Sequence, residues 1–265
     1  MELTDLIGKL PYRMALAGGW IDQPFVSRHN PRPPGSMVVA SLEPFMRFMD
    51  RSGLATGTRV AARKLWPDAL PDRPREQLVR ELYHEENKSL ADPSGSQDMI
   101  GLIYPGISRL EYDFAHEGGV FPCRIESTSD PEIVAWLESV IHVIPVAPRP
   151  PGFNPHGETN LDPELIRGLG QSGRDCWDAI VTRDLAGLGK SLNECVRCYS
   201  QILPHTLRHP TLTAFDYVKF QELYQRRYPG AMYSGCGGGY LYVASDEPVP
   251  GAFKMKIRVE QATHE

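Results

Sequence analysis

The sequence predicts a mixed α+β fold, because strand-like and helix-like segments alternate irregularly along the chain. Residues 14–17 and 37–40 are short apolar segments with strand composition. A much longer region, residues 161–203, carries apolar side chains at helical spacing and predicts two packed helices. No segment repeats at a fixed period and none is of low complexity, which excludes a solenoid.

Length and charge restrict the classes of protein to consider. A chain of 265 residues suits one large domain or two small, closely packed ones. A net charge of −5 argues against a protein that mainly binds the nucleic-acid backbone. No apolar run approaches the roughly 18 residues of a membrane span, and the first nine residues lack the order of a signal peptide. We therefore expect a cytoplasmic protein with neither a nucleic-acid nor a membrane partner, of undetermined oligomeric state.

The five cysteines do not indicate a disulfide framework, because they are odd in number and widely spread. Cys195 and Cys198 form a Cys-x-x-Cys pair inside a helical pattern, with no second pair and no well-spaced histidines. We interpret both as residues of a helix face and not as zinc ligands.

The elements of the first half follow from local signals. Residues 10–20 predict a strand that ends in a tight turn at Gly18-Gly19, and a proline-rich loop precedes the strand at 37–40. The remaining segments are a helix over 59–66 after a loop of small residues, a helix over 75–90, a helix over 99–104 after a polar turn, and paired strands over 107–114 and 120–126.

The second half opens with a buried strand over residues 139–146. After the helices of 161–203, residues 205–228 continue with helical composition. Residues 231–244 predict two strands around a glycine turn, and residues 254–259 alternate as a last strand.

Three glycine-bearing segments carry the clearest chemical signals. In residues 11–22, a strand ends in two glycines and is followed by Asp22, where close backbone approach and a carboxylate acceptor suit a polyhydroxylated ligand. Residues 53–59 form a small-residue loop before a helix, whose amides and positive end can bind phosphates. Residues 234–240 form a third glycine-rich turn, which lacks the following helix and ribose-binding acid of a dinucleotide site.

In this order, the segments resemble the motifs of the galactokinase, homoserine kinase, mevalonate kinase and phosphomevalonate kinase (GHMP) superfamily. Residues 86–98 are close to a pattern of bacterial heptose-phosphate kinases, in which a helix glutamate precedes Gly-x-Gln-Asp. The resemblance covers almost the whole chain and extends to fucokinase-type enzymes. It implies a two-lobed fold, with a ribosomal protein S5 domain 2-like N-terminal lobe over residues 1–138 and a ferredoxin-like C-terminal lobe over residues 139–265.

The resemblance also implies roles for individual residues. Asp98 would be the catalytic base, and Glu86 and Thr58 would hold magnesium, with Glu85 as an alternative to Glu86. Thr56 or Thr58 would replace a serine of the usual phosphate loop, because Gly57 stands in its place. The residues expected to bind ATP are Gly53, Leu54, Ala55, Thr56, Gly57, Thr58, Gly237 and Gly238, and those expected to bind substrate are Arg13, Gly19, Asp22 and Gln97, with His29 and Arg149 as further candidates by position.

The activity implied is ATP-dependent phosphorylation of a hydroxyl of a sugar or sugar phosphate, with ATP and Mg²⁺ as cofactors and a small sugar-like molecule as partner. Such a reaction needs charge neutralisation at the phosphates and a carboxylate that orients the attacking hydroxyl. Two alternatives remain open. One is a catalytically weak or inactive homologue that binds nucleotide or sugar as a sensor or scaffold, and the other is an enzyme acting on a non-sugar alcohol.

Overall fold

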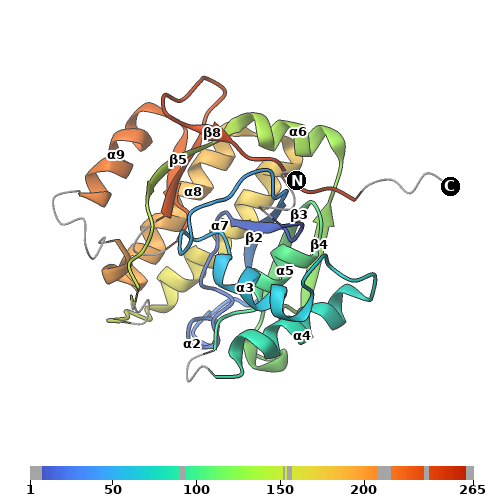
Figure 1. Cartoon of the computed structure of the whole chain (residues 1–265). Helices are drawn as coiled ribbons and strands as arrows, with labels where there is room; N and C mark the ends of the chain where they lie inside the picture. Colours follow the sequence, from blue (N-terminus) through green and yellow to red (C-terminus); the bar gives the residue numbers. More distant parts are fainter. Residues whose placement is uncertain are drawn as a thin grey trace.

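Two antiparallel sheets form the framework of the molecule in the computed structural model, which describes residues 8–89, 93–151, 153, 157–207, 216–235 and 239–260. Helices surround both sheets (Figure 1), so the predicted α+β class is confirmed. None of the helices in these ranges is long and apolar enough to cross a bilayer.

The first sheet belongs to the N-terminal half of the chain. Its strands lie in the order in which they occur in the sequence, each antiparallel to the next: β1 Tyr12–Ala15, β2 Gly35–Leu42, β3 Ile107–Tyr112 and β4 Arg124–Thr128. Every residue of β1 and β2 is buried, as expected of strands covered on both faces.

The second sheet is assembled from the C-terminal half. Its order is β6-β7-β5-β8, and its strands are β5 Ile141–Ala147, β6 Gly230–Tyr233, β7 Gly239–Ala244 and β8 Phe253–Lys254. Val143 of the central strand β5 pairs with Tyr242 on one side and with Phe253 on the other. The predicted strands on either side of a glycine turn are therefore confirmed.

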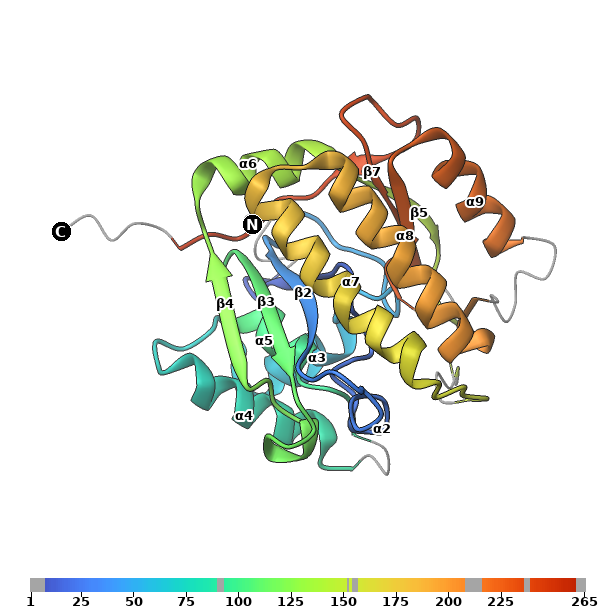
Figure 2. The same cartoon turned by 180° about the vertical axis from the view of Figure 1, so that it is seen from behind.

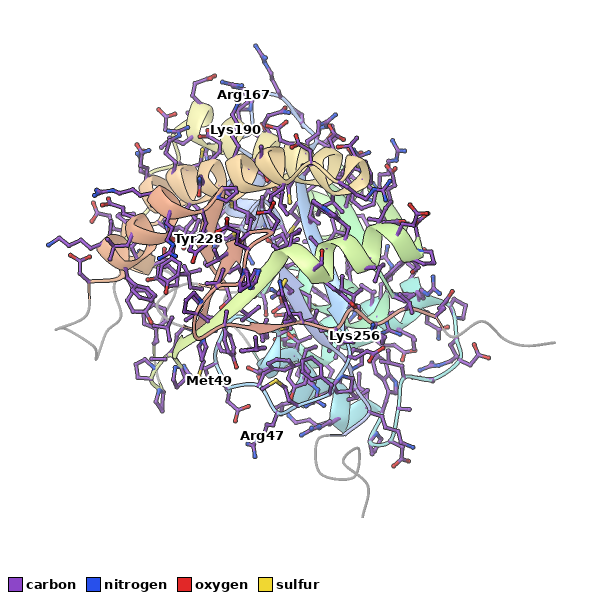
Figure 3. The ribbon with its side chains drawn as sticks, turned by 90° about the horizontal axis from the view of Figure 1, so that it is seen from above. Arg47, Met49, Arg167, Lys190, Tyr228 and Lys256 are labelled. Atoms are coloured by element: carbon purple, nitrogen blue, oxygen red, sulfur yellow. The ribbon has the colours of Figure 1, made fainter. Side chains whose placement is uncertain are left out.

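The helices cover the first sheet on both faces. On one face lie α3 Thr56–Leu65, α4 Arg75–Asn87 and α5 Gln97–Ile103. On the other face lies the predicted long helix α7 Pro163–Thr182. The second long helix, α8 Leu185–Ile202, packs beside α7 and against β6 and β7 of the second sheet (Figure 2). Arg167 and Lys190 mark this side in Figure 3, opposite Arg47 and Met49 in the segment after β2. The remaining elements are α2 Pro24–Ser27, η1 Glu117–Gly119, α6 Pro131–Val140, η2 Pro204–Leu207 and α9 Tyr217–Arg227.

Helix α7 lies directly on strand β2 because two of its glycines leave room for the strand. A Cβ atom on Gly173 would lie 1.9 Å from the carbonyl oxygen of Ser36, and one on Gly170 would lie 2.8 Å from Cα of Gly35. Both distances are shorter than van der Waals contact, so larger residues would force helix and sheet apart. On the next helix, Cys195 and Cys198 are buried, which confirms their interpretation as helix-face residues.

The prediction of a strand over 139–146 is wrong at its start, because Ser139 and Val140 end a helix that the sequence analysis does not foresee. Helix α6 begins after Asp130, whose side chain accepts hydrogen bonds from the amides of Glu132 and Ile133 at 2.8 and 3.2 Å. The helix runs into β5 without an intervening turn, so its apolar residues merge with those of the strand. The division of the chain at residue 138 stays a prediction.

Two further strand predictions need correction. The strand predicted over 120–126 begins only at Arg124, since Val120–Pro122 form a turn in which the proline has no N–H to donate. Of the strand predicted over 254–259, only Lys254 belongs to a strand, β8. Beyond it the chain crosses to the first sheet, where the amide of Arg258 donates to the carbonyl of Ser41 at 2.9 Å.

Candidate active site

A cavity of about 580 Å³ brings together most of the residues that the sequence analysis selects. It is formed by β1 and the turn after it, by the starts of α3 and α5, by α4 and by the end of β6. The selected residues that line it are Arg13, Gly19, Asp22, Gly53, Ala55, Thr56, Gly57, Thr58, Glu86, Gln97, Asp98 and Arg149. The exceptions among the described residues are Leu54, whose side chain is fully buried, Glu85, which lines an outer groove, and His29, which is exposed. Gly237 and Gly238 lie outside the described residues.

The start of α3 forms one wall of the cavity. Gly53 has φ +80° and Ala55, at the N-cap, has φ +56°, so the chain turns sharply before the first helical residue, Thr56. The first amides of a helix have no acceptor within the helix and carry its positive dipole end. Because Gly57 and Thr58 also line the cavity, this helix end can bind an anion there.

The hydroxyl of Thr58 lies between two carboxylates at the centre of the site. Its Oγ1 is 3.0 Å from Oε1 of Glu86 and 3.3 Å from Oδ2 of Asp98, and it donates to one of them at a time. The carboxylates come from α4 and from the first turn of α5. The glycine loop and Asp98 therefore converge on the same cavity although 40 residues separate Thr58 from Asp98.

Arg13 connects β1 with the loop at Gly53 and with helix α5. Its Nη2 forms an ion pair with Oδ1 of Asp98, and its Nη1 donates to the carbonyl oxygen of Gly53 at 3.2 Å. The side chain fits beside α5 because residue 101 is glycine, where a Cβ would lie 2.0 Å from Cγ of Arg13. Burial lowers the pKa of Arg13 to about 10, which still leaves the guanidinium charged at neutral pH. The ion pair fixes the orientation of the Asp98 carboxylate.

Glu86, and not Glu85, belongs to the cavity. Burial raises the pKa of Glu86, and hydrogen bonding to Thr58 and the charge of Arg13 oppose the rise. Its Oε2 atom is buried and has no hydrogen-bond partner among the described residues. Glu85 points to an outer groove and pairs with Nζ of Lys88 at 2.8 Å. Of the two glutamates considered, only Glu86 offers an unpartnered oxygen in the site.

Asp22 lies in the wall opposite the start of α3. Its side chain is 1% exposed, and burial raises its pKa to about 6, although the charge of Arg13 acts against the rise. Nε2 of Gln97 approaches Oδ1 at 3.5 Å, while Oδ2 has no partner among the described residues. Oδ2 packs against Gly95, where a Cβ would lie 1.8 Å away. A buried carboxylate with an open acceptor position suits a ligand that supplies hydroxyl donors.

Ser234 and Tyr240, the described ends of the third glycine-rich segment, lie against the loop before α3. The hydroxyl of Ser234 donates to the carbonyl of Ser52 and accepts a hydrogen bond of 2.9 Å from the amide of Tyr240. A Cβ on Gly53 would lie 2.3 Å from the carbonyl oxygen of Ser234, so only glycine allows this contact. The hairpin between β6 and β7 thus holds the loop at the start of α3 in place.

Backbone strain is concentrated at this cavity. Five non-glycine residues have positive φ among the described residues, and Trp20, Arg51 and Ala55 of these line the cavity. Each such conformation costs roughly 1–3 kcal/mol and persists only where the surrounding structure enforces it. Strain of this kind is typical of functional sites.

The sequence analysis misses several residues of the cavity wall. Cys195 and Tyr199 lie one helical turn apart on α8, and Cys195 Sγ accepts from the amide of Gly18 at 3.2 Å. Arg51 also lines the cavity, and its carbonyl accepts from Nε of Arg149 at 3.2 Å. The helical spacing of Cys195 and Tyr199 is visible in the sequence, but no local pattern indicates that this part of α8 passes the turn after β1.

Comparisons with known proteins place this geometry in a structural context. No family model and no curated protein sequence matches the chain. Among solved structures, it is similar to a D-glycero-D-manno-heptose 1-phosphate kinase from Bacteriodes thetaiotaomicron, with a TM-score of 0.60, 14% identity and 94% of each chain covered. A mevalonate kinase matches with a TM-score of 0.56 and 10% identity, over 95% of this chain and 99% of that one.

A third similar structure is a galactokinase from Lactococcus lactis in complex with galactose, with a TM-score of 0.55, 13% identity, and 90% of this chain and 85% of that one covered. Identities this low establish the fold and not the reaction. The chain has the fold of the GHMP kinases, which is the fold that the resemblance of its three glycine-bearing segments predicts.

Proposed function

We propose that the protein is a small-molecule kinase that transfers the γ-phosphoryl group of ATP to a hydroxyl of a sugar or sugar phosphate. The observation that carries the proposal is the position of the Thr58 hydroxyl, 3.0 Å from Glu86 and 3.3 Å from Asp98, at the start of α3. It joins a helix end suited to phosphates with two carboxylates in one cavity, which is the arrangement that phosphoryl transfer requires.

The nucleotide phosphates would bind at the loop 53–58, where backbone amides and the positive end of α3 compensate their charge. Glu86 and Thr58 would hold magnesium, because both offer the hard oxygen ligands that this ion prefers and Oε2 of Glu86 has no hydrogen-bond partner in the described part of the chain. When bound, magnesium would neutralise negative charge on the β- and γ-phosphates. Thr58 supplies the hydroxyl that Gly57 lacks.

Asp98 would orient the acceptor hydroxyl and take its proton as the oxygen bonds to the γ-phosphorus and the bond to the β-phosphate oxygen breaks. The ion pair with Arg13 fixes the position of the carboxylate, which suits a reaction whose transition state needs positioning more than a strong base. Asp22 and Gln97 would hold other hydroxyls of the acceptor, with Gly19 leaving space beside them, where a Cβ would meet nothing within 4 Å.

The test is a coupled ADP-release assay over sugars, sugar phosphates and small alcohols. We expect turnover on at least one acceptor, and Asp98→Asn is expected to reduce kcat at least 100-fold while magnesium-dependent thermal stabilisation by ATP persists. Asp68→Asn, at an exposed aspartate outside the cavity, is the matched control and should retain activity.

A second pair of variants separates the two neighbouring glutamates of α4. Glu86→Gln is expected to raise the magnesium concentration needed for half-maximal activity, whereas Glu85→Gln leaves it unchanged. Ligand binding without turnover on any acceptor would instead support the alternative of an inactive sensor or scaffold. No thermal shift with millimolar ATP and magnesium would contradict both functions.

A further inference from the structure

A second cavity, of about 390 Å³, adjoins the candidate active site. Asp22, Gln23 and Ser94 line both cavities, so the two cavities meet at these three residues. The volume lies within the range of roughly 300–1,000 Å³ found for small-molecule sites. A molecule bound at Asp22 therefore has a second compartment directly beside it.

The lining of the second cavity is largely apolar. Phe25 comes from α2, Tyr83 from α4 and Val120 from the turn before β4, together with Pro24 and Pro93. Phe25 makes an edge contact with Trp20, with ring centroids 6.2 Å apart, and Tyr83 makes a tilted contact with Phe121, with centroids 5.1 Å apart. Both aromatic side chains are half-buried and each contributes part of its surface to the cavity.

The charges are distributed differently in the two cavities. The first contains Arg13, Asp22, Glu86 and Asp98 together. Among the described residues that line the second, the charged side chains are Asp22, which is shared with the first, and Arg28, which is exposed. Burial raises the pKa of Tyr83, so that its phenol stays neutral at physiological pH. The charged candidate active site thus adjoins a cavity whose lining favours the binding of apolar groups.

We propose that the acceptor is an alcohol with an apolar, ring-sized substituent, bound with its hydroxyl-bearing part between Asp22 and Asp98 and its substituent between Phe25, Tyr83 and Val120. This inference rests on the proposed function and names the substrate class of the same site. Removing a ring-sized apolar group from water is expected to tighten binding roughly 10- to 50-fold relative to the same alcohol without it.

The experiment compares matched ligands by isothermal titration calorimetry on the full-length chain. The probes are the methyl and 4-nitrophenyl glycosides of glucose, galactose, mannose and fucose, which differ only in the substituent. We expect the 4-nitrophenyl glycoside of at least one sugar to bind at least 10-fold more tightly than its methyl counterpart. Equal affinities within all pairs, or no binding by any of the eight compounds, would overturn the proposal.

Two variants test whether the second cavity causes the difference in affinity between the two glycosides. Val120→Trp should fill the cavity and abolish the difference between the two glycosides without changing the affinity for the methyl glycoside. Tyr83→Ala, which removes one aromatic wall, should reduce the difference and keeps the test decisive if Val120→Trp does not fold. Val218→Trp, at an exposed valine of α9, is the control and should preserve the difference.

Three outcomes separate this proposal from its alternatives. If sugar phosphates bind more tightly than 4-nitrophenyl glycosides and Arg28→Ala removes that preference, the cavity takes an anion and the apolar assignment is wrong. A preference for the 4-nitrophenyl glycosides without ADP release would contradict the kinase and not the apolar compartment. ADP release with equal affinities for both glycosides would contradict the apolar compartment alone.

Discussion

Replacing Asp22 by asparagine should change how the stability of the folded chain depends on pH. The carboxyl group has a pKa of about 6 in the folded protein, because burial disfavours its ionised form, against an ordinary value of 3.8. Between these values the folded state binds more protons than the unfolded state. The free energy of unfolding therefore falls as pH rises through this window.

The size of the effect follows from the difference of about 2.2 pH units between about 6 and 3.8. At about 1.36 kcal/mol per unit, ionisation of Asp22 lowers the free energy of unfolding by about 3 kcal/mol above pH 7. About 2 kcal/mol of this is lost between pH 4 and pH 7.5. Asp22→Asn cannot ionise, so its stability relative to the original chain should increase by that amount over the same interval.

Urea unfolding, followed by tryptophan fluorescence at pH 4 and pH 7.5, measures this difference. Any constant penalty for placing an amide at this position cancels, because it contributes equally at both pH values. Asp68→Asn, at an exposed site, is the control and should show no pH-dependent difference. A difference between Asp22→Asn and the original chain that stays constant with pH would refute the assignment of a raised pKa to this residue.

Three further predictions concern single contacts described above. Gly53→Ala should lower the free energy of unfolding by about 3 kcal/mol, since its Cβ would clash with the Ser234 carbonyl. The control is Gly118→Ala, where φ is +65° and no atom lies within 4 Å, and it should cost only about 1 kcal/mol in urea unfolding. Equal losses in the two variants would contradict the clash. Thr58→Val should reduce the rate of ADP release at least 100-fold, whereas Thr58→Ser, which keeps the hydroxyl, should retain most of the rate. Asp130→Ala should cost about 1 kcal/mol in thermal unfolding through loss of the cap of α6; an unchanged midpoint would contradict that role.

The sequence predicts most elements because their signals are local. The turn at Gly18 and the loop at Gly53 require positive φ, which glycine adopts readily, and the apolar spacing of α7 and α8 persists over five turns or so of helix. Helix α6 escapes prediction although Asp130 and Pro131 give the ordinary signal for a helix start. Its apolar residues continue directly into β5, and no turn residue separates the two periodicities.

The candidate site is predictable as a set of residues and not as a geometry. The resemblance to kinase motifs selects Thr58, Glu86 and Asp98, but whether their side chains meet depends on the packing of α3, α4 and α5 against the sheet. The choice between Glu85 and Glu86 shows the limit, because adjacent helix residues differ by about 100° in direction and only the tertiary packing decides which one is buried. The second cavity has no sequence signature, since its walls come from five separate segments.

The contact between Ser52 and Ser234 has a consequence for the order of events during synthesis. These residues are 182 positions apart, and Tyr240 completes the arrangement through its amide. A ribosome releases the N-terminal strands and α3 long before the β6–β7 hairpin is synthesised, so the loop at Gly53 initially lacks the contacts with Ser234 that hold it in place. Nascent chains that end before Tyr240 should therefore be unable to retain nucleotide, even where their N-terminal sheet has already formed.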